Sequence, residues 1–525
     1  MNSSQLLRRG LAALCFAVFA LPAGAQSFEI QCPESTALHP TANAAEPAYT
    51  GPIAPDGTAA ENGAIKCQQL SGGDGFATMA DGTQTYLFAF GPLSGLQDIK
   101  HGLPGTEFAS QFLQPYQRNA SDPNDPDAAL NGNGAVGLEP QTDADGNISP
   151  GHADPRPIMD VGVLNGNMPA PMIAIDEDDE LFLTLTNVGQ IMRPDLFEQH
   201  TVHFHGYPNA SSFYDGVPDA SVAINIGGSF TYYYLAPDAG TYIWHCHITP
   251  PEHLQMGMVG QIYVRPRQNR VPVGNGLRAA LELQQNDLRT ASNCASDVLC
   301  GSPVPAANSV AQTINPRTHR PQMYAYNDGD GSTAYDVEYP IQIHGFDPDF
   351  HFVGMTFNPE NFTDSKNKYF LLNGRSYPDT ITEGALSTQV ADGTDHFSQP
   401  LPTIINIPVG GKALLRFGDL ETNEFQTLAS LGVPMHVIAL NARLLRDMAG
   451  NDTSYYTNSI TMGGGESLDV ILDASDTSKY HVGEKYYLYT PNLDHLSNDA
   501  ENFGGLMTEV NICGSVDPDL KNCGP

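Results

Sequence analysis

The sequence HTVHFHG spans residues 200–206, and the sequence TYIWHCHITPPEHLQMGM spans residues 241–258. If both stretches form β-strands, successive side chains point to opposite faces, so residues an even number apart lie on the same face. His203 and His205 are two positions apart and therefore share a face. His200 lies three positions before His203, so we expect it on the other face. The two stretches predict neighbouring strands with histidines on both sides.

Cys246 obeys the same alternation in the second stretch. Its thiol is expected to point away from its neighbours His245 and His247. The segment after this strand adds His253 and Met258, which a loop can return to the thiol. One side thus collects the following potential metal ligands: His200, Cys246, His253 and Met258. The other side collects these four histidines: His203, His205, His245 and His247.

Two imidazoles, one thiolate and a distant thioether form the ligand set of a blue-copper electron-transfer site. Met256 is the competing thioether, but the five-residue step from His253 favours Met258. The four histidines on the other side suit a second copper. A lone HxH pair would be weak support for a metal, and zinc prefers closed tetrahedral ligand sets. The number and parity of these ligands therefore predict copper at both sides.

The two stretches resemble the multicopper oxidase family, whose motifs are HxxHxHG and HCHxxxHxxxxM. The sequence MPAP at residues 168–171, after Asn165-Gly166, is also similar to the opening of that family's first domain. The resemblance is strong over about 155–265 and looser over 366–515. It implies cupredoxin domains, a type 1 copper, a type 2/type 3-like copper centre, oxidation of a phenol or metal ion, and transfer of the electrons to dioxygen at the histidine-bound centre.

The chain departs from the family pattern in two ways. His253 lies seven residues after Cys246 rather than five, so the loop with Pro250 and Pro251 is longer. The family's trinuclear centre also takes four histidines from a second domain, which are missing here. In that domain His436-Val-Ile-Ala439-Leu-Asn441 and Tyr489-Thr490-Pro491 stand where the two motifs would fall. His344, preceded by Gln342 and followed by Gly345, is the first candidate for a replacement ligand, ahead of His351 and His495.

Two other functions remain open at this point. A copper nitrite-reductase-like enzyme would use His200, His205, His245, Cys246, His253 and Met258. However, His203 occupies its catalytic aspartate position, His247 follows the cysteine, and Asn441 stands where a neighbouring subunit would supply a ligand. A non-catalytic electron carrier or copper-storage protein would keep only the type 1 site. A 525-residue chain is large for a carrier, and the four extra histidines would then have no use.

Composition favours an all-β protein, because 51 glycines, 40 prolines and few charged residues suit many strands and turns. We expect two cupredoxin-like Greek-key β-sandwich domains with an irregular N-terminal extension. The expected divisions are a signal peptide at 1–25, an extension of unknown function at 26–150, a copper-binding domain at 151–267, a connecting region at 268–365, and a second sandwich lacking most copper ligands at 366–525.

The N-terminus predicts export to the periplasm or the outside. Arg8 and Arg9 precede an apolar run and the small-residue site Ala23-Gly24-Ala25, which is typical of a signal peptide. The paired arginines leave the twin-arginine route open beside the general one. Of eight cysteines, Cys15 lies in the signal and Cys246 in the copper motif. The remaining six suggest three disulfides, which sequence proximity pairs as follows: 32 with 67, 294 with 300, and 513 with 523.

A formal net charge of −35 argues against binding to nucleic acid, because phosphates need a basic surface. No other apolar stretch is long enough to span a bilayer, so we expect no membrane insertion. The acidic surface would accept metal cations as readily as phenols. Because one sandwich supplies only half of a trinuclear centre, the remaining ligands are expected from another domain or chain. A homo-oligomer, most economically a trimer, would provide them.

Overall fold

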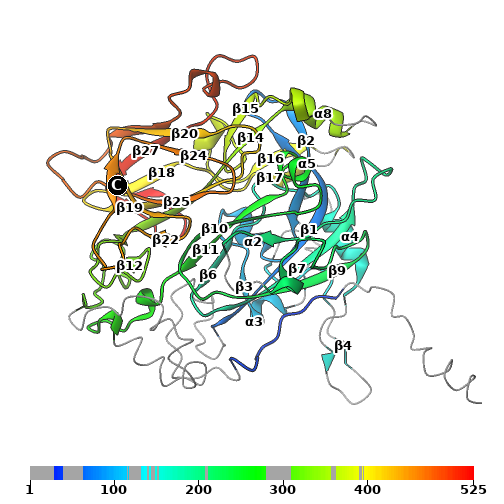
Figure 1. The fold of residues 1–525 in the computed structure, drawn as a ribbon, viewed down its shortest axis with the longest axis horizontal. Helices are drawn as coiled ribbons and strands as arrows, with labels where there is room; N and C mark the ends of the chain where they lie inside the picture. The colour runs from blue at the N-terminus through cyan, green and yellow to red at the C-terminus, as the bar shows by residue number, and fades with distance from the viewer. Residues whose placement is uncertain are drawn as a thin grey trace, which may run out of the picture.

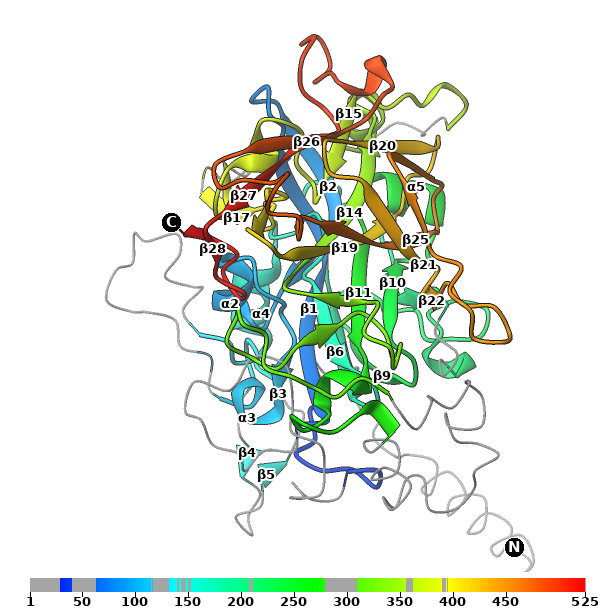
Figure 2. The same ribbon diagram turned by 90° about the vertical axis from the view of Figure 1, so that its left-hand side faces the viewer.

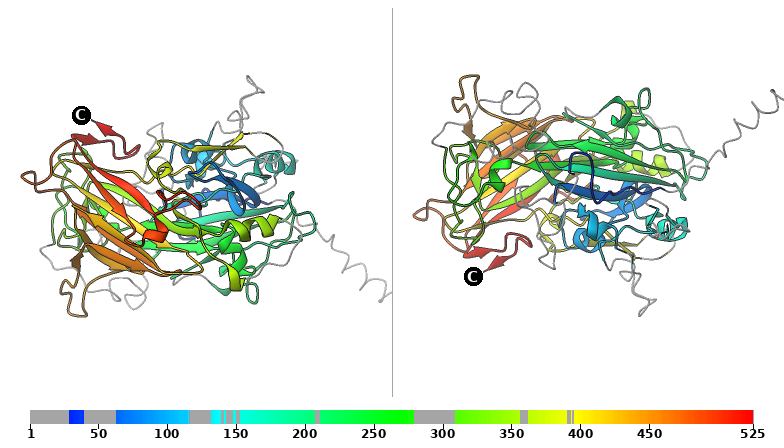
Figure 3. Two further views of the ribbon diagram at one scale, coloured as in Figure 1. Left: turned by 90° about the horizontal axis from the view of Figure 1, so that it is seen from above. Right: turned by 90° about the horizontal axis from the view of Figure 1, so that it is seen from below.

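The computed structural model describes residues 29–39, 63–114, 116, 132–138, 141–142, 148–149, 153–206, 211–278, 309–355, 362–389, 393 and 395–524. Within these residues most of the regular structure is strand, and the helices are short. The expectation of an all-β protein is confirmed. The strands form two sandwiches that lie side by side, and Figure 3 shows the second, in orange and red, beside the first, in blue and green.

The first sandwich pairs two sheets. One sheet has the order β2-β1-β7-β9, with β3 beside β1: β1 (Ile65–Thr78), β2 (Gln84–Pro92), β3 (Glu107–Phe108), β7 (Glu180–Gly189) and β9 (Ser229–Leu235). The other has the order β6-β11-β10-β8: β6 (Ile173–Asp176), β8 (His203–Phe204), β10 (Gly240–His245) and β11 (Val259–Arg265). A buried aromatic and aliphatic core that includes Phe90, Tyr232 and Trp244 fills the space between them. Figure 1 shows these strands in blue and green.

The second sandwich is built in the same way. One sheet has the order β15-β14-β19-β25-β21-β22, with β23 beside β21: β14 (Val337–Phe346), β15 (Tyr369–Leu372), β19 (Lys412–Asp419), β21 (Met435–Leu440), β22 (Arg443–Leu444), β23 (Tyr455–Thr457) and β25 (Ser467–Asp473). The other has the order β18-β27-β26-β20-β24: β18 (Ile405–Pro408), β20 (Gln426–Leu431), β24 (Ser459–Met462), β26 (Lys485–Tyr489) and β27 (Met507–Cys513). Figure 2 is viewed from the side of this sandwich and shows its orange and red strands in front of the blue strands of the first.

Shorter elements connect and cover the sheets. The helices are α2 (Leu96–Lys100), α3 (Ala109–Phe112), α4 (Pro155–Gly162), α5 (Pro250–Gln255) and α8 (Pro348–Met355). Single 3₁₀ turns are η2 (Ser212–Tyr214), η3 (Arg267–Arg270), η5 (Phe362–Asp364), η6 (Asp379–Ile381) and η7 (Leu493–His495). Two-stranded ribbons pair β4 (Gln141–Thr142) with β5 (Ile148–Ser149), β12 (Met323–Tyr324) with β13 (Ala334–Tyr335), β16 (Leu386–Gln389) with β17 (Asp395–Ser398), and β28 (Ser515–Val516) with β29 (Cys523–Gly524). None of the described helices has the length and apolar character needed to cross a membrane.

Two expected boundaries differ from the observed sheets. Residues 26–150 were expected outside the first sandwich, but β1 and β2 lie within it, and β1 pairs in parallel with β7. The glycines of β1 hid this strand, because they look like turn formers in a sequence. A glycine is needed where another backbone or a ring comes close to the strand. A Cβ on Gly75, for example, would clash with the backbone of Gly166. Likewise β14, from the expected connecting region 268–365, pairs with β19 in the second sandwich.

The cysteine pairing agrees with the expectation where the structure describes it. Cys32 is bonded to Cys67, which ties the N-terminal segment to β1, and Cys513 is bonded to Cys523. Cys246 carries a free, buried thiol. The expected bond between Cys294 and Cys300, like the expected signal peptide at 1–25, lies outside the described residues.

A buried ionic cluster joins the two sandwiches. Glu338 of β14 accepts hydrogen bonds from Arg416 of β19 and from Arg265 of β11, at 3.0 and 2.9 Å. Burial alone would raise the pKa of Glu338, but the two guanidinium groups outweigh burial and lower this pKa to about 2. Thr241 of β10 also donates to Asp469 of β25 at 2.5 Å. Strand β10 is therefore held against the second sandwich.

Candidate metal centre

Three segments gather the first ligand set: His200 lies before β8, Cys246 directly follows β10, and His253 lies on α5. The ligand atoms of His200, Cys246 and His253 all lie within 4.8 Å of one another, and all three side chains are fully buried. His253 Nδ1 is 3.2 Å from the Cys246 sulfur. His200 is fixed by a two-residue bridge to Ile224, with both backbone hydrogen bonds near 3 Å. The backbone N–H of Thr201 points at the sulfur from 3.4 Å.

These side chains fit a metal because their polar atoms lack other partners. Neither ring nitrogen of His200 has a hydrogen-bond partner among the described residues, and His253 turns its Nδ1 toward the Cys246 sulfur. Burial lowers the pKa of His200 well below its usual value and that of His253 to about 3, so both rings are neutral and keep a lone pair. Burial raises the pKa of the Cys246 thiol to about 11. A thiolate here needs a cation beside it, which bound metal provides.

Both candidate methionines are buried in the same core cluster as Cys246. Met258 is tied to the other ligands through its backbone, because its carbonyl accepts from the Cys246 N–H at 3.1 Å and its N–H donates to His253 at 2.8 Å. The Met256 carbonyl instead accepts from Phe88 of β2 at 3.1 Å. These contacts favour Met258 as the axial ligand, and the choice stays a prediction.

The second ligand set lies on the opposite side of β10. His203 pairs with His245 across β8 and β10, and the ligand atoms of His203, His205 and His245 lie within 4.8 Å of one another. His205 Nε2 is 2.9 Å from His245 Nε2. The ring of His247 lies 4.9 Å from that of His203, centroid to centroid. The four histidines thus form one cluster, called the four-histidine cluster below.

The four-histidine cluster is less enclosed than the first set. His203 is 18% exposed, His205 and His247 are half-buried, and only His245 is buried. Burial lowers the pKa of His245 to about 3 and also lowers that of His205, so these rings are neutral and able to bind a metal. Within the described residues, the second sandwich contributes to this cluster the backbone of Gly465, which lies against His205, and no histidine.

The structure does not bring His344 to the four-histidine cluster, which differs from our expectation. His344 is fully buried in β14, where its Nδ1 lies 3.0 Å from the Leu420 carbonyl. Strand-like neighbours place it in the sheet as expected, but the sheet turns its ring toward α5 rather than toward His203. Its own chain encloses it, so it is also unable to reach another copy.

The other histidines that we considered have local partners. His351 of α8 lies 2.9 Å from the Gln255 carbonyl, and His495 sits between Gln426 and Glu424 at 2.9 and 3.0 Å. His436 stacks on Tyr456 and contacts Ser454. We assign no metal to any of them.

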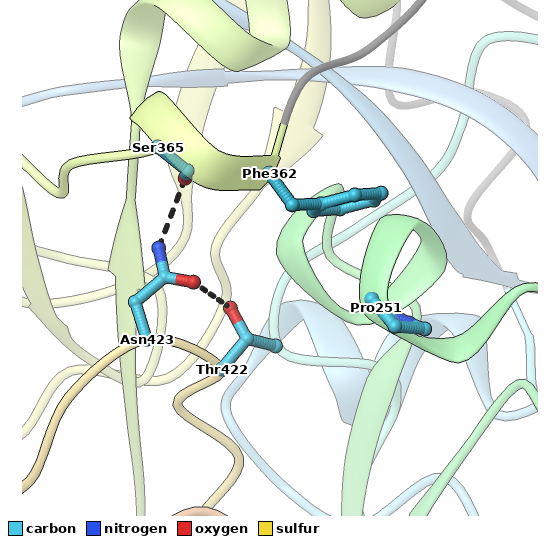
Figure 4. Close-up of a pocket in the computed structure, with 5 residues that line it drawn as sticks. All are labelled: Pro251, Phe362, Ser365, Thr422 and Asn423. Atoms are coloured by element: carbon cyan, nitrogen blue, oxygen red, sulfur yellow. Dashed lines mark hydrogen bonds between the residues drawn. The ribbon is translucent and has the colours of Figure 1, made fainter.

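A pocket of about 450 Å³ opens against α5, the helix that carries His253. Figure 4 shows its lining, in which the Phe362 ring and Pro251 face the polar side chains of Ser365, Thr422 and Asn423. Asn423 donates to Ser365 at 3.0 Å, and Thr422 donates to Asn423 at 3.2 Å. The pocket therefore combines one aromatic face with a hydrogen-bonded polar wall.

Three residues near the first ligand set were not predicted from the sequence to belong to the site. Gly72 of β1 faces His200, Glu198 places its carboxylate 3.8 Å from His253 Nε2, and Gln255 links α5 to the second sandwich. The Gly-Gly pair at 72–73 could have indicated that another group comes close to this strand, but the sequence does not identify that group as His200. For Glu198 and Gln255 the sequence held no signal, because exported proteins contain many such residues.

Residues 147–269 match a family described as multicopper oxidase. A laccase of Aspergillus fumigatus, Laccase abr2, is 35% identical over 109 residues, which cover 20% of this chain and 17% of the relative. Laccase 1 of Metarhizium guizhouense is 30% identical over 135 residues, 25% of this chain and 20% of the relative. The chain thus matches about a fifth of the length of these relatives.

A copper-containing nitrite reductase of Neorhizobium galegae is 34% identical over 106 residues, 20% of this chain and 25% of that protein. Among solved structures, a blue copper oxidase from Nitrosomonas europaea superposes with a TM-score of 0.47 at 17% identity, covering 85% of each chain.

Proposed function

We propose that the chain, of which residues 147–269 match a multicopper oxidase family, is a copper-dependent oxidoreductase that takes single electrons from a reducing substrate and delivers them to dioxygen. The observation that carries this proposal is the arrangement of two ligand sets on opposite sides of one strand end, joined through Cys246 and its neighbours. A carrier needs the first set alone.

We assign a type 1 copper to His200, Cys246, His253 and Met258, and a type 2/type 3-like centre to His203, His205, His245 and His247. Bound copper supplies one-electron redox chemistry at both places. The chain's own contribution is the connection, because Cys246 is bonded through the backbone to His245 and His247. An electron that enters at the thiolate side has a short covalent route to the four-histidine cluster.

The donor side is expected at His253. Its Nε2 faces the carboxylate of Glu198 at 3.8 Å, and Glu198 is 26% exposed. Glu198 can therefore accept a proton from a hydroxyl group that gives up an electron nearby. A phenol or a metal cation would each find a favourable contact, since a carboxylate accepts hydrogen bonds and attracts cations.

A nitrite-reductase-like activity is the second candidate, favoured by the similarity to the Neorhizobium galegae enzyme. His203 in place of that family's aspartate and His247 after the cysteine speak for the oxidase instead. For the site of action we propose the periplasm or the exterior, on the signal-like N-terminus.

The proposed type 1 site has a direct optical test. Oxidised, copper-loaded protein should be blue, with a strong absorption in the red that arises from charge transfer between the Cys246 thiolate and copper. Cys246→Ser should abolish this band while the four-histidine cluster still binds copper. A colourless wild-type protein with copper bound would show that the assignment of the first set is wrong.

A further inference from the structure

Helix α5, which is six residues long, contacts Cys246 on one face and the second sandwich on the other. His253 and Gln255 are two positions apart, which on an α-helix turns their side chains by about 200°. His253 faces Cys246, and Gln255 faces the second sandwich. An isolated helix of this length is unstable, and the Thr249 side chain forms no cap at its N-terminus. The position of α5 must therefore come from tertiary contacts.

The Gln255 side chain supplies such contacts on the far face of α5. It is 1% exposed, and its Nε2 donates to Asn367 Oδ1 at 3.1 Å and to Thr422 Oγ1 at 3.3 Å. Its Oε1 accepts from the Asp347 N–H at 3.2 Å. The amide thus uses both of its donors and one of its acceptor sites. All of these partners belong to the second-sandwich side.

The partners of Gln255 are themselves fixed. Asn367 donates to the buried Glu421 at 2.8 Å, and Asp347 accepts from the N–H of Asp349 at the start of α8. On the backbone of Gln255, the His351 ring lies 2.9 Å from the carbonyl. A network in which every member is bonded holds its geometry more firmly than single bonds do.

We propose that Gln255 is a positioning residue through which the second sandwich sets the place of His253 at the type 1 copper. The loop from Cys246 to His253 is two residues longer than the family spacing, so the loop itself constrains His253 less. The Gln255 network replaces that constraint from outside the first sandwich. This inference rests on the proposed function, because it assumes copper at His253.

Gln255→Met keeps the length of the side chain and removes all three hydrogen bonds. In the full-length, copper-loaded protein we expect a shifted red absorption band and copper loss to a chelator that is about 10- to 100-fold faster, as for other residues that orient metal ligands. Thr422→Val removes a single acceptor and should give a smaller change in the same direction, which keeps the test available if Gln255→Met does not fold.

Gln261→Met is the matched control. Gln261 is also a fully buried glutamine of the first sandwich that donates to the second, to the Arg416 carbonyl at 2.7 Å, but it lies on β11 away from α5. This variant should lower thermal stability and leave the band and the copper-loss rate unchanged. An unchanged band and rate in Gln255→Met, or equal changes in both variants, would overturn the inference. A wild type without the band would instead overturn the proposed function.

Discussion

Gly72 shows how one residue of β1 makes room for a copper ligand. A Cβ at this position would lie 2.9 Å from Cδ2 and 3.3 Å from Cγ of His200, and the first of these distances is shorter than real side-chain contacts. His200 has little freedom to yield, because a two-residue bridge fixes its backbone. The absence of a side chain at position 72 is therefore part of the site.

We predict that Gly72→Ala displaces the His200 ring, weakens copper binding and costs about 1–3 kcal/mol of stability, as overpacking does elsewhere. Copper titration and urea unfolding measure the two effects. Ser71→Ala is the control, since it changes the neighbouring buried residue without adding volume and should leave copper affinity unchanged. Normal copper affinity in Gly72→Ala would mean that the β1 backbone moves aside instead.

Residue patterns also explain what the sequence could predict about the site. The division of the histidines and Cys246 between two sides followed from the alternation of side chains along 200–206 and 241–247, which depends only on neighbouring positions. Gly72 and Gln255 could not be recognised, because their roles depend on residues more than a hundred positions away. His344 was expected at the four-histidine cluster because its Gly345 neighbour resembled a motif, whereas its Nδ1 lies 3.0 Å from the Leu420 carbonyl of its own sandwich.

Among the elements, β1 marks the limit of sequence reasoning about the fold. Alternating patterns in 151–267 and 366–525 predicted one sandwich in each range, and in the structure each range contributes strands to two sheets that pack as a sandwich. Strand β1 has a parallel partner, β7, more than a hundred residues later, and its glycines fill close contacts rather than turns. A local sequence pattern does not show such a distant pairing. The first sandwich was therefore expected to begin at residue 151, whereas β1 begins at Ile65.

The two described disulfides tie different elements and should differ in what they contribute. Cys32–Cys67 closes a separation of 35 residues and attaches the N-terminal segment to β1, whereas Cys513–Cys523 closes 10. Loop-closure entropy gives about 4 and about 3 kcal/mol, respectively. We predict that the double variant Cys32→Ser/Cys67→Ser unfolds at lower urea concentration than Cys513→Ser/Cys523→Ser. Both should stay blue when loaded with copper, and the reverse order of stability would contradict the prediction.

For the whole molecule, the interface between the sandwiches decides what can complete the four-histidine cluster. Arg416 and Asp469 are buried in this interface, and Arg416 bonds Glu338 of its own sandwich while Asp469 accepts from Thr241 of β10. Separating the sandwiches would take Arg265 away from the buried Glu338 and Thr241 away from the buried Asp469, and the loss of such partners is costly in a buried setting. The second sandwich therefore cannot swing to bring another face to His203.

We predict that the active protein is a homo-oligomer, most economically a trimer, in which another copy covers the four-histidine cluster. The four-histidine cluster is partly exposed. The second sandwich of the same chain places only the backbone of Gly465 against it among the described residues, and the interface holds that sandwich in place.

Sedimentation and a copper count per chain should be measured together, because a carrier holds one copper, a nitrite reductase two and an oxidase up to four. Dilution that dissociates the oligomer should lower dioxygen consumption with a phenol while the blue band persists, since the first ligand set lies within one chain. A strictly monomeric protein with full turnover would exclude a shared site and require that the ligands come from this chain alone.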